Sequence, residues 1–344
     1  MQDKKILIVG GGIAGLTLAY RLFQRHLPFE IWTKQENHSS SVAAGLMIPI
    51  VFRRTTKSWR IDEFLPKAEE FYTNLEQKFG VSLWHPVKIR RSFSHEQERE
   101  DWLKKKQDPS YAQYLGDMNT TENANIYHEF GTGIVEKAAW VDGSVLLPTL
   151  TKFFEDKNCL RYQNFSFAPE NLQKIKATFE KIVFCEGYEL IHNPFFNYLP
   201  LDPTKGQVLV IESDEISETE SINRKCFVLP IGNRQFKVGS TYEWHDSTLN
   251  ATNEAREELE NHLKSLISAR YDVVQQLVGV RPTVKDRRPL LGQHPTEKQL
   301  YVLNGFGTKG YLLSPAMTEQ MADLLQSGKE LDAEISIKRC KKLD

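Results

Sequence analysis

The sequence predicts an α/β protein in which strands and helices alternate and which is divided into two domains. The chain has 344 residues, and at roughly 150 residues per domain this length favours about two domains. Hydrophobic residues make up 40% of the chain, enough for a large core, which excludes intrinsic disorder. An apolar run, a glycine-rich turn and a helix follow one another near the N-terminus and again near the C-terminus. This order is typical of parallel strands covered by helices.

The N-terminal unit begins with the apolar run Ile6-Leu7-Ile8-Val9, as expected for a parallel strand that is buried on both faces. A glycine-rich turn over 10–15, a helical apolar face and a second strand over 29–33 follow. A G-x-G-x-x-G motif between strand and helix lets the backbone approach a pyrophosphate, which then binds at the helix N-terminus. A purely structural turn is the alternative. The predicted dinucleotide contacts in this turn are Gly10, Gly12, Ile13, Ala14 and Gly15.

The C-terminal unit has the same order. An apolar strand over 300–303 continues into Gly305-Phe306-Gly307-Thr308-Lys309-Gly310. We expect the next helix to have Ser314 as its N-cap and Pro315 at its first position, because these residue types favour those positions. The two glycine-rich turns are therefore predicted to face one extended ligand from opposite ends.

The middle of the chain adds further helices and strands. Apolar spacings of three and four residues predict amphipathic helices over 64–79 and 254–270. The segment 95–108 is mostly charged and is expected to be a solvated helix or a surface excursion. Residues 126–141 and 205–241 are rich in strand-forming types and predict much of a second sheet.

Charge and cysteine content exclude several classes of protein. The 44 Lys and Arg residues balance 45 Asp and Glu residues, whereas non-specific nucleic-acid binding needs a clear excess of positive charge. The four cysteines lie far apart without a C-x-x-C pair, which fits neither a zinc site nor a dense disulfide framework. No apolar stretch reaches about 18 residues, so no membrane span is predicted. We expect a soluble, cytoplasmic protein without a bound metal.

A carboxylate is expected at the end of the second strand, where dinucleotide-binding folds hold the adenosine ribose. Thr33 and Lys34 stand there instead. A threonine hydroxyl still hydrogen-bonds to a ribose hydroxyl, although more weakly than a carboxylate does. Thr33 and Lys34 are therefore the predicted contacts, and Glu36 is the alternative if the following loop bends back.

Four segments together resemble a known family of enzymes. Besides the glycine-rich N-terminus, they are 40–49 (SSVAAGLMIP), 279–292 (GVRPTVKDRRPLLG) and 304–310 (NGFGTKG). Their content and order are similar to the FAD-dependent D-amino acid oxidase superfamily, especially its glycine oxidase and sarcosine oxidase-like branches. The resemblance extends over nearly the whole chain and is weakest over 85–130.

The resemblance implies an FAD-dependent oxidoreductase that oxidises the C–N bond of a small amine or amino acid. Such enzymes transfer a hydride from the carbon beside the amine to flavin N5, and molecular oxygen is the expected acceptor. Because the cofactor supplies the reactive chemistry, the protein mainly orients the substrate and tunes the flavin. The loops around Arg281 and Gly305 hold no cysteine, so we expect non-covalent FAD.

The resemblance also implies which residues act on the substrate. The predicted catalytic residues are Arg281, which would bind a substrate carboxylate in a bidentate manner, and Lys309, which would stabilise the reduced flavin or promote oxygen reduction. The alternatives are an ion pair of Arg281 with Asp286 and a surface position for either cation. Phe227 stands where the family has a substrate-contacting tyrosine, which suggests a different or bulkier amine. The other predicted substrate contacts are Met47, Tyr242 and Arg53.

Further FAD contacts are implied by the same segments. Residues of the 40–49 segment are expected along the flavin ring, and backbone N–H groups of the C-terminal turn near its pyrimidine oxygen. Gly187 matches the last residue of an Ala-Thr-Gly-type cofactor turn. These additional contacts are Ala44, Gly45, Leu46, Met47, Gly187, Gly305, Gly307, Thr308, Lys309 and Gly310.

The implied architecture is a discontinuous, Rossmann-like FAD-binding domain and a substrate domain built on a mixed β-sheet. We expect the FAD-binding domain to comprise 1–85, 130–200 and 280–344. The substrate domain is then formed by 86–129 and 201–279.

Two other functions are compatible with the sequence. The oxidase half of the bacterial bifunctional enzyme that modifies tRNA wobble uridines also lacks the acid after its second strand, and it oxidises a carboxymethylaminomethyl group. Against it, we expect no methyltransferase domain in this chain, and its charge shows no basic excess for tRNA. The third possibility is a dinucleotide-binding module without catalysis. The sequence does not determine the substrate, its stereochemistry, the electron acceptor or the oligomeric state.

Overall fold

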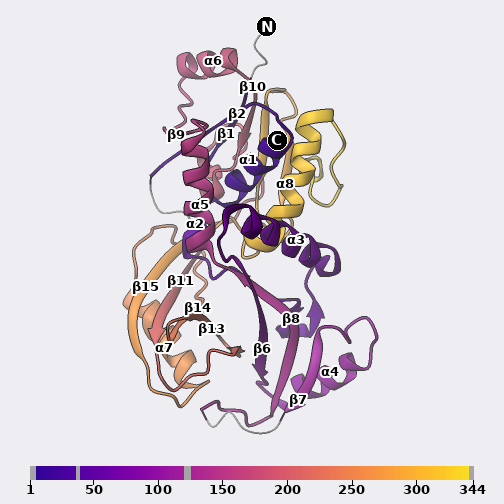
Figure 1. Ribbon diagram of the computed structural model, residues 1–344, viewed down its shortest axis with the longest axis vertical. Coiled ribbons are helices and arrows are strands. Elements are labelled where there is room, and N and C mark those ends of the chain that lie inside the picture. The colour runs from indigo at the N-terminus through magenta and orange to yellow at the C-terminus, as the bar shows by residue number, and fades with distance from the viewer. Residues whose placement is uncertain (1–4, 36–38, 120–124, 341–344) are drawn as a thin grey trace.

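The computed structural model describes residues 5–35, 39–119 and 125–340 and shows an α/β arrangement with two large sheets (Figure 1). Within these residues, one sheet has six strands, a second has nine, and two short strands form a separate ribbon. Figure 1 shows the six-stranded sheet with helices α1 and α8 in the upper part of the view and the larger sheet below it. Among the described residues, no helix combines the length and apolar character that a membrane span requires.

The smaller sheet is mostly parallel and has the strand order β16-β17-β10-β1-β2-β9. Only β16 runs antiparallel to its neighbour, at one edge. The strands of this sheet are β1 (Lys5–Val9), β2 (Phe29–Thr33), β9 (Leu160–Tyr162), β10 (Phe179–Phe184), β16 (Leu290–Gln293) and β17 (Leu300–Asn304).

Helices cover both faces of this sheet because its central strand is apolar on both sides. Ile6 and Ile8 of β1 belong to one core, whereas Leu7 and Val9 belong to a second core on the opposite face. Alternate residues of a strand point to opposite faces, so the continuous apolar run is buried on both faces of the sheet. The first core includes residues of α1 (Ile13–Gln24), α3 (Ile61–Phe79), α5 (Gly143–Asp156) and α8 (Gly310–Ser327), and the second includes a residue of α6 (Pro169–Thr178).

The larger sheet is mixed, as the sequence predicts. Its order is β15-β11-β14-β13-β12-β6-β8-β3, with β7 beside β8, and only the β12–β6 pair is parallel. Its strands are β3 (Leu46–Met47), β6 (Trp84–Ser92), β7 (Leu115–Asn119), β8 (Thr132–Val141), β11 (Thr204–Glu212), β12 (Glu220–Asn223), β13 (Phe227–Gly232), β14 (Gln235–Gly239) and β15 (Asp272–Arg281).

The remaining elements are short or lie on the larger sheet. Helix α7 packs its apolar residues Leu259 and Leu263 into a third core with β11 and β14. The charged segment 95–108 forms a helix, one of the two expected alternatives, and this helix buries Trp102. These elements are α2 (Ser39–Val42), β4 (Ile50–Val51), β5 (Thr56–Lys57), α4 (Glu96–Lys106) and α7 (Asn253–Lys264).

Three features differ from the expectations. Helix α7 ends at Lys264 instead of continuing to residue 270, and Ile267 forms a β-bridge with Ile126. Helix α8 begins at Gly310 rather than after Ser314, so Ser314 and Pro315 are buried inside the helix. The hydroxyl of Ser314 lies 3.2 Å from that of Tyr72, and it therefore contributes to packing instead of capping. Strand β8 pairs with β6 in the larger sheet, although the expected division placed 130–200 with the FAD-binding domain. The domain boundaries stay predictions.

Candidate active site

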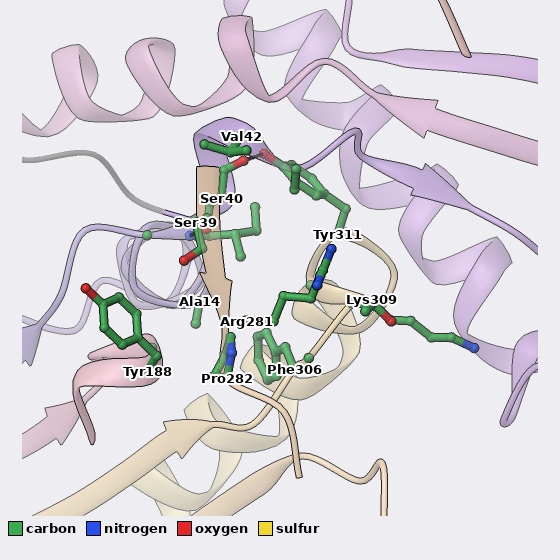
Figure 2. Close-up of a pocket in the computed structure, with 18 of the residues that line it drawn as sticks. Ala14, Ser39, Ser40, Val42, Tyr188, Arg281, Pro282, Phe306, Lys309 and Tyr311 are labelled. Carbon is green, nitrogen blue, oxygen red and sulfur yellow. Dashed lines mark hydrogen bonds between the residues drawn. The ribbon is translucent and has the colours of Figure 1, made fainter. Parts of the chain in front are cut away.

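A large pocket lies where the carboxyl ends of the parallel strands meet the larger sheet. Its volume is about 690 Å³, within the range of roughly 300–1,000 Å³ that is usual for ligand sites. The turn after β1, the turn before α8 and the ends of β14 and β15 all contribute to its lining. Figure 2 shows residues from these distant segments, among them Ala14, Arg281 and Phe306, around the same cavity.

The first glycine-rich turn presents backbone to the pocket. Gly10 has a φ of +113°, and a Cβ atom there would lie 2.3 Å from the carbonyl oxygen of Cys185. Gly12 is the N-cap of α1 without a side-chain cap, and the first turn of the helix carries no acidic residue. The partial positive charge of this helix end is therefore available to a phosphate. Of the predicted contacts, Gly10, Gly12, Ile13 and Ala14 line the pocket.

Gly15 and Thr33 have structural roles beside this turn. Gly15 is not part of the lining, and a Cβ atom there would lie 1.9 Å from the carbonyl oxygen of Gly10, so glycine permits the close packing of helix and turn. The backbone N–H of Gly11 donates to Thr33 Oγ1 at 3.1 Å. Thr33 therefore ties the end of β2 to the turn, although it was predicted as a ribose contact. Thr33 and Lys34 both line the pocket, and Glu36 lies outside the described residues.

The second glycine-rich turn also opens directly into a helix at the pocket. Gly307, Thr308, Lys309 and Gly310 are part of the lining, whereas Gly305 is not. Gly305 has a φ of +76°, and a Cβ atom there would meet the side chain of Val284 at 2.8 Å. The start of α8 thus faces the pocket with no side-chain cap, as the start of α1 does.

Asn304 links this turn to the segment after β10. Its side-chain amide donates to the carbonyl oxygen of Gly187 at 2.9 Å, and its Oδ1 accepts the N–H of Gly305 at 2.7 Å. Gly187, a predicted cofactor contact, lines the pocket. The side chain of Asn304 therefore links two turns that are far apart in the sequence.

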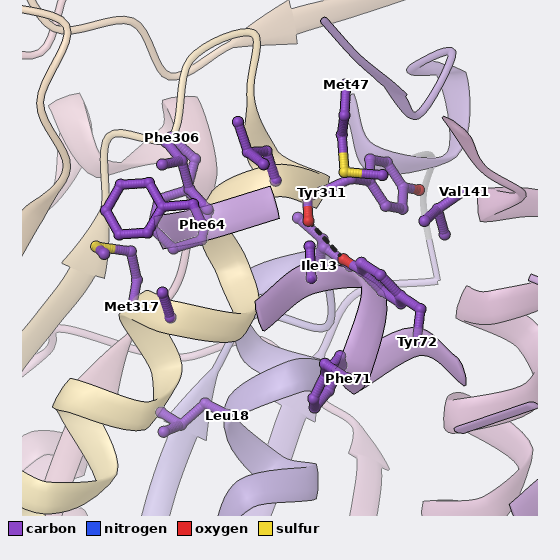
Figure 3. Packing of buried hydrophobic residues seen from close by; sticks show 14 of the residues in the cluster. Ile13, Leu18, Met47, Phe64, Phe71, Tyr72, Val141, Phe306, Tyr311 and Met317 are labelled. Atoms are coloured by element: carbon purple, nitrogen blue, oxygen red, sulfur yellow. Dashed lines mark hydrogen bonds between the residues drawn. The ribbon is translucent and has the colours of Figure 1, made fainter. Parts of the chain in front are cut away.

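Helix α2 contributes a residue that sequence reasoning missed. Ser40 Oγ accepts the N–H of Ile13 at 3.0 Å, and the Ser40 carbonyl oxygen accepts the hydroxyl of Tyr311 at 2.7 Å. Figure 3 shows Tyr72 reaching Tyr311 from the core, where its hydroxyl donates to the Tyr311 carbonyl oxygen at 2.7 Å. These bonds hold the starts of α1 and α8 in place around the pocket.

The segment 44–47 lines the pocket beside these helices, as the resemblance implies. Its members Ala44, Gly45, Leu46 and Met47 are all part of the lining. Gly45 has a φ of +69°, and a Cβ atom there would lie 2.0 Å from the carbonyl oxygen of Val141, so this close approach to β8 requires glycine.

Arg281 ends β15 and lies across the backbone of β11. A Cβ atom at Gly206 would lie 2.0 Å from Arg281 Nη2, so glycine leaves the room that the guanidinium fills. Nη2 donates to Ser240 Oγ at 2.7 Å, while Nη1 donates to the carbonyl oxygens of Lys205 at 3.3 Å and Thr241 at 3.2 Å. The side chain is therefore held in one orientation at the wall of the pocket.

None of these three acceptors is a carboxylate, so they do not neutralise the positive charge of Arg281. Within residues 5–35, 39–119 and 125–340, Arg281 forms no ion pair, and Asp286 pairs with Arg339 at 3.0 Å instead. Burial lowers the pKa of Arg281, Tyr242 opposes this change and the charge of Arg287 adds to it. A guanidinium nevertheless stays protonated in proteins. A desolvated cation of this kind favours an anionic ligand beside it.

The other predicted substrate contacts divide into two groups. Phe227 and Tyr242 line the pocket, and the ring of Tyr242 lies 4.6 Å from the guanidinium carbon of Arg281. Tyr242 is 53% exposed and therefore belongs to the rim. Arg53 is exposed and is not part of the lining, so the structure does not bring it to the substrate end.

Lys309 lines the pocket, and Figure 2 shows its side chain extending away from Arg281. Burial lowers its pKa to about 8, and the charges of Arg288 and Arg287 add to this effect. Among the described residues, none forms an ion pair or hydrogen bond with its ammonium group. A ligand that carries negative charge, or that accepts a hydrogen bond from the ammonium group, would favour the charged form.

Comparison with known proteins identifies the family. The DAO family model, described as FAD dependent oxidoreductase, matches residues 5–324. The chain belongs to this family of FAD-dependent oxidoreductases. The resemblance to the D-amino acid oxidase superfamily is thereby confirmed.

Individual relatives are distant in sequence but similar over the whole chain. A glycine oxidase of Bacillus licheniformis is 24% identical over 93% of this chain and 92% of its own length. The tRNA 5-methylaminomethyl-2-thiouridine biosynthesis bifunctional protein of Marinobacter nauticus is 21% identical over 92% of this chain, which spans 55% of that longer protein. The fold is shared with the crystal structure of iminodiacetate oxidase from Chelativorans sp. BNC1, at a TM-score of 0.78, 18% identity and coverage of 98% and 99% of the two chains.

The residues present fit FAD. The N-cap residues of α1 and α8, Gly12 and Lys309, provide no side-chain cap, so the partial positive charge of both helix ends suits the anionic groups of FAD. The close-packed glycines let the backbone approach a ligand of this size. The same pocket is lined by both glycine-rich turns and by Arg281. A cofactor and a small second molecule can therefore share the cavity.

Proposed function

We propose that this FAD-dependent oxidoreductase oxidises the C–N bond of a small amine that carries a carboxylate. The observation that supports this proposal best is the Arg281 guanidinium, which lines the cofactor pocket and has no acidic partner among the described residues. Relatives named glycine oxidase and a structural neighbour named iminodiacetate oxidase belong to the same substrate class.

The roles of the protein groups follow from their positions. Bound FAD supplies the hydride acceptor. Arg281 holds the substrate carboxylate, and the hydrogen bond to Ser240 with the ring of Tyr242 fixes the angle of the guanidinium. Phe227 adds an apolar wall that excludes water but offers no hydrogen bond to the carboxylate. We further propose that Lys309 keeps positive charge near the cofactor while oxygen, the proposed acceptor, is reduced.

Anaerobic reduction of the bound flavin tests the proposal. The holoenzyme is mixed with glycine, sarcosine, D-amino acids, L-proline or iminodiacetate, and the loss of the visible flavin absorbance is followed. Each compound is paired with the matching amine that lacks the carboxylate. We expect a carboxylate-bearing amine to bleach the flavin and its partner to fail. Bleaching by the amines alone, or by no compound of the panel, contradicts the proposal.

A second candidate is oxidation of a glycine-like group attached to a larger molecule. The observation that favours it is the open rim of the pocket, where Tyr242 and Leu249 are 53% and 43% exposed. The similarity to the tRNA-modifying bifunctional protein points the same way. If modified tRNA or a modified nucleoside bleaches the flavin while the free amino acids do not, this candidate replaces the first.

A further inference from the structure

A carboxyl group that neither the fold nor the proposed reaction uses lies at the far end of the pocket. Glu186 follows β10 by two residues and lines the cavity. It precedes a short 3-10 turn but does not cap it. Its Oε2 accepts the side-chain amide of Asn193 at 2.8 Å, which is its one hydrogen bond among the described residues. A carboxylate has room for further donors.

The position of Glu186 relates it to the missing acid after β2. Strands β10 and β2 both flank β1, so their carboxyl ends lie on one edge of the sheet about 10 Å apart. Lys34 directly follows β2, and its positive charge acts on Glu186. Both residues line the pocket, and the strands that they follow lie on opposite sides of β1.

This end of the pocket is remote from the substrate end. Figure 2 places Tyr188, two residues after Glu186, on the opposite side of Ala14 from Arg281. Because Ala14 lies in the first turn of α1, whose N-terminus suits a pyrophosphate, we place Glu186 on the side where the adenosine half of FAD belongs. Thr33 is occupied at the same end by the N–H of Gly11.

We propose that Glu186 replaces the usual acid after β2 and binds the ribose hydroxyls of the adenosine half of FAD. The dinucleotide fold normally supplies this acceptor from the second strand, and here the neighbouring strand on the other side of β1 supplies it. Lys34 offsets the charge of the carboxylate.

The electrostatics of Glu186 support a role in binding hydrogen-bond donors. Burial raises its pKa to about 7, the hydrogen bond from Asn193 and the charge of Lys34 oppose this change, and the charge of Glu189 adds to it. Burial of a carboxyl group without full hydrogen bonding is unfavourable. Donation from ribose hydroxyls would provide the missing bonds.

Flavin binding to the full-length chain tests the proposal. Flavin is removed, and the dissociation constants of FAD and of FMN, which lacks the adenosine half, are measured by quenching of flavin fluorescence. We expect Glu186→Ala to weaken FAD binding roughly tenfold or more, the effect of losing a hydrogen bond to a charged group, and to leave FMN binding unchanged. Glu180→Ala, at the exposed start of the same strand, is the matched control and should change neither constant.

Two results would overturn the proposal: unchanged FAD binding in Glu186→Ala, or equal weakening of FAD and FMN. If that variant does not fold, Glu186→Gln keeps an acceptor for Asn193 and is measured in the same way. Competition against FAD by ADP and 2′-deoxy-ADP adds a test of the ribose itself, because the wild-type chain should prefer ADP and the variant should not. These readouts need no substrate, so they are independent of the amine that the enzyme oxidises.

Discussion

At the scale of single residues, the chemistry of a motif is easier to predict than the hydrogen-bond partner of each side chain. Arg281 was identified from its segment, and the structure places it in the pocket with Ser240 and without an acid. Thr33, a predicted ribose contact, lines the pocket, and its hydroxyl also accepts the N–H of Gly11. Arg53 has the right charge and lies outside the lining. Such pairings depend on contacts between segments far apart in the sequence, which residue type does not reveal.

Replacement of Lys309 by methionine is expected to stabilise the flavin-free protein near neutral pH. The folded-state pKa of about 8 lies below the ordinary value of 10.5, so folding opposes the charged form. For such a group the free energy of unfolding rises with pH between about 8 and 10.5 in the wild type. The free energy of unfolding of Lys309→Met should therefore exceed that of the wild type by at most about 3 kcal/mol at pH 7. This difference should disappear near pH 10.5.

Urea unfolding at the two pH values measures this effect. Lys285→Met is the control. Lys285 is an exposed lysine in the loop between β15 and β16, and its replacement should not raise the free energy of unfolding. Equal stability of the wild type and Lys309→Met at neutral pH would show that the surroundings of Lys309 do not oppose its charge.

At the scale of elements, periodic apolar patterns located the helices and strands, but their ends depended on tertiary contacts. Helix α8 was expected to begin after Ser314, because serine and proline favour the first positions of a helix. It begins at Gly310, where the hydroxyl of Tyr72 binds the carbonyl oxygen of Tyr311 and the hydroxyl of Tyr311 binds Ser40. These bonds come from α3 and α2, so local sequence could not indicate the earlier start.

The link between β2 and the first glycine-rich turn gives an element-scale prediction. Thr33→Val keeps the shape of the side chain and removes the acceptor for the Gly11 N–H. We expect a loss of about 1–3 kcal/mol in the free energy of unfolding and weaker FAD binding, because the turn is no longer held. Thr33→Ser retains a hydroxyl and should behave nearly as the wild type. If valine and serine have the same effect, the hydrogen bond does not support the turn.

At the scale of the whole molecule, the sequence predicted two sheets and a pocket between distant segments, whereas it did not indicate which strands pair across the expected domain division. Strand β8 pairs with β6 in the larger sheet, whereas its position in the sequence suggested the FAD-binding domain. Long-range strand pairing is set by register and by the faces that become buried. The pocket is lined by residues from both sheets, so a ligand bound in it would contact both sheets.

Removal of FAD is therefore expected to lower the stability of the entire chain. At a free FAD concentration one hundred times its dissociation constant, binding contributes about 2.7 kcal/mol. The melting temperature should rise as FAD is added back to the flavin-free protein, and FMN or ADP should each restore part of the increase. A melting temperature that does not respond to FAD would place the cofactor outside this pocket.

The most direct test of the proposed chemistry is the substrate dependence of anaerobic flavin reduction in Arg281→Met and Arg281→Lys. For the carboxylate-bearing amine that reduces the wild-type enzyme fastest, we expect half-saturation to rise at least about thirtyfold in Arg281→Met. The lysine variant should recover part of the loss, and both variants should retain FAD. Unchanged half-saturation in Arg281→Met, with FAD still bound, would show that Arg281 does not hold the substrate.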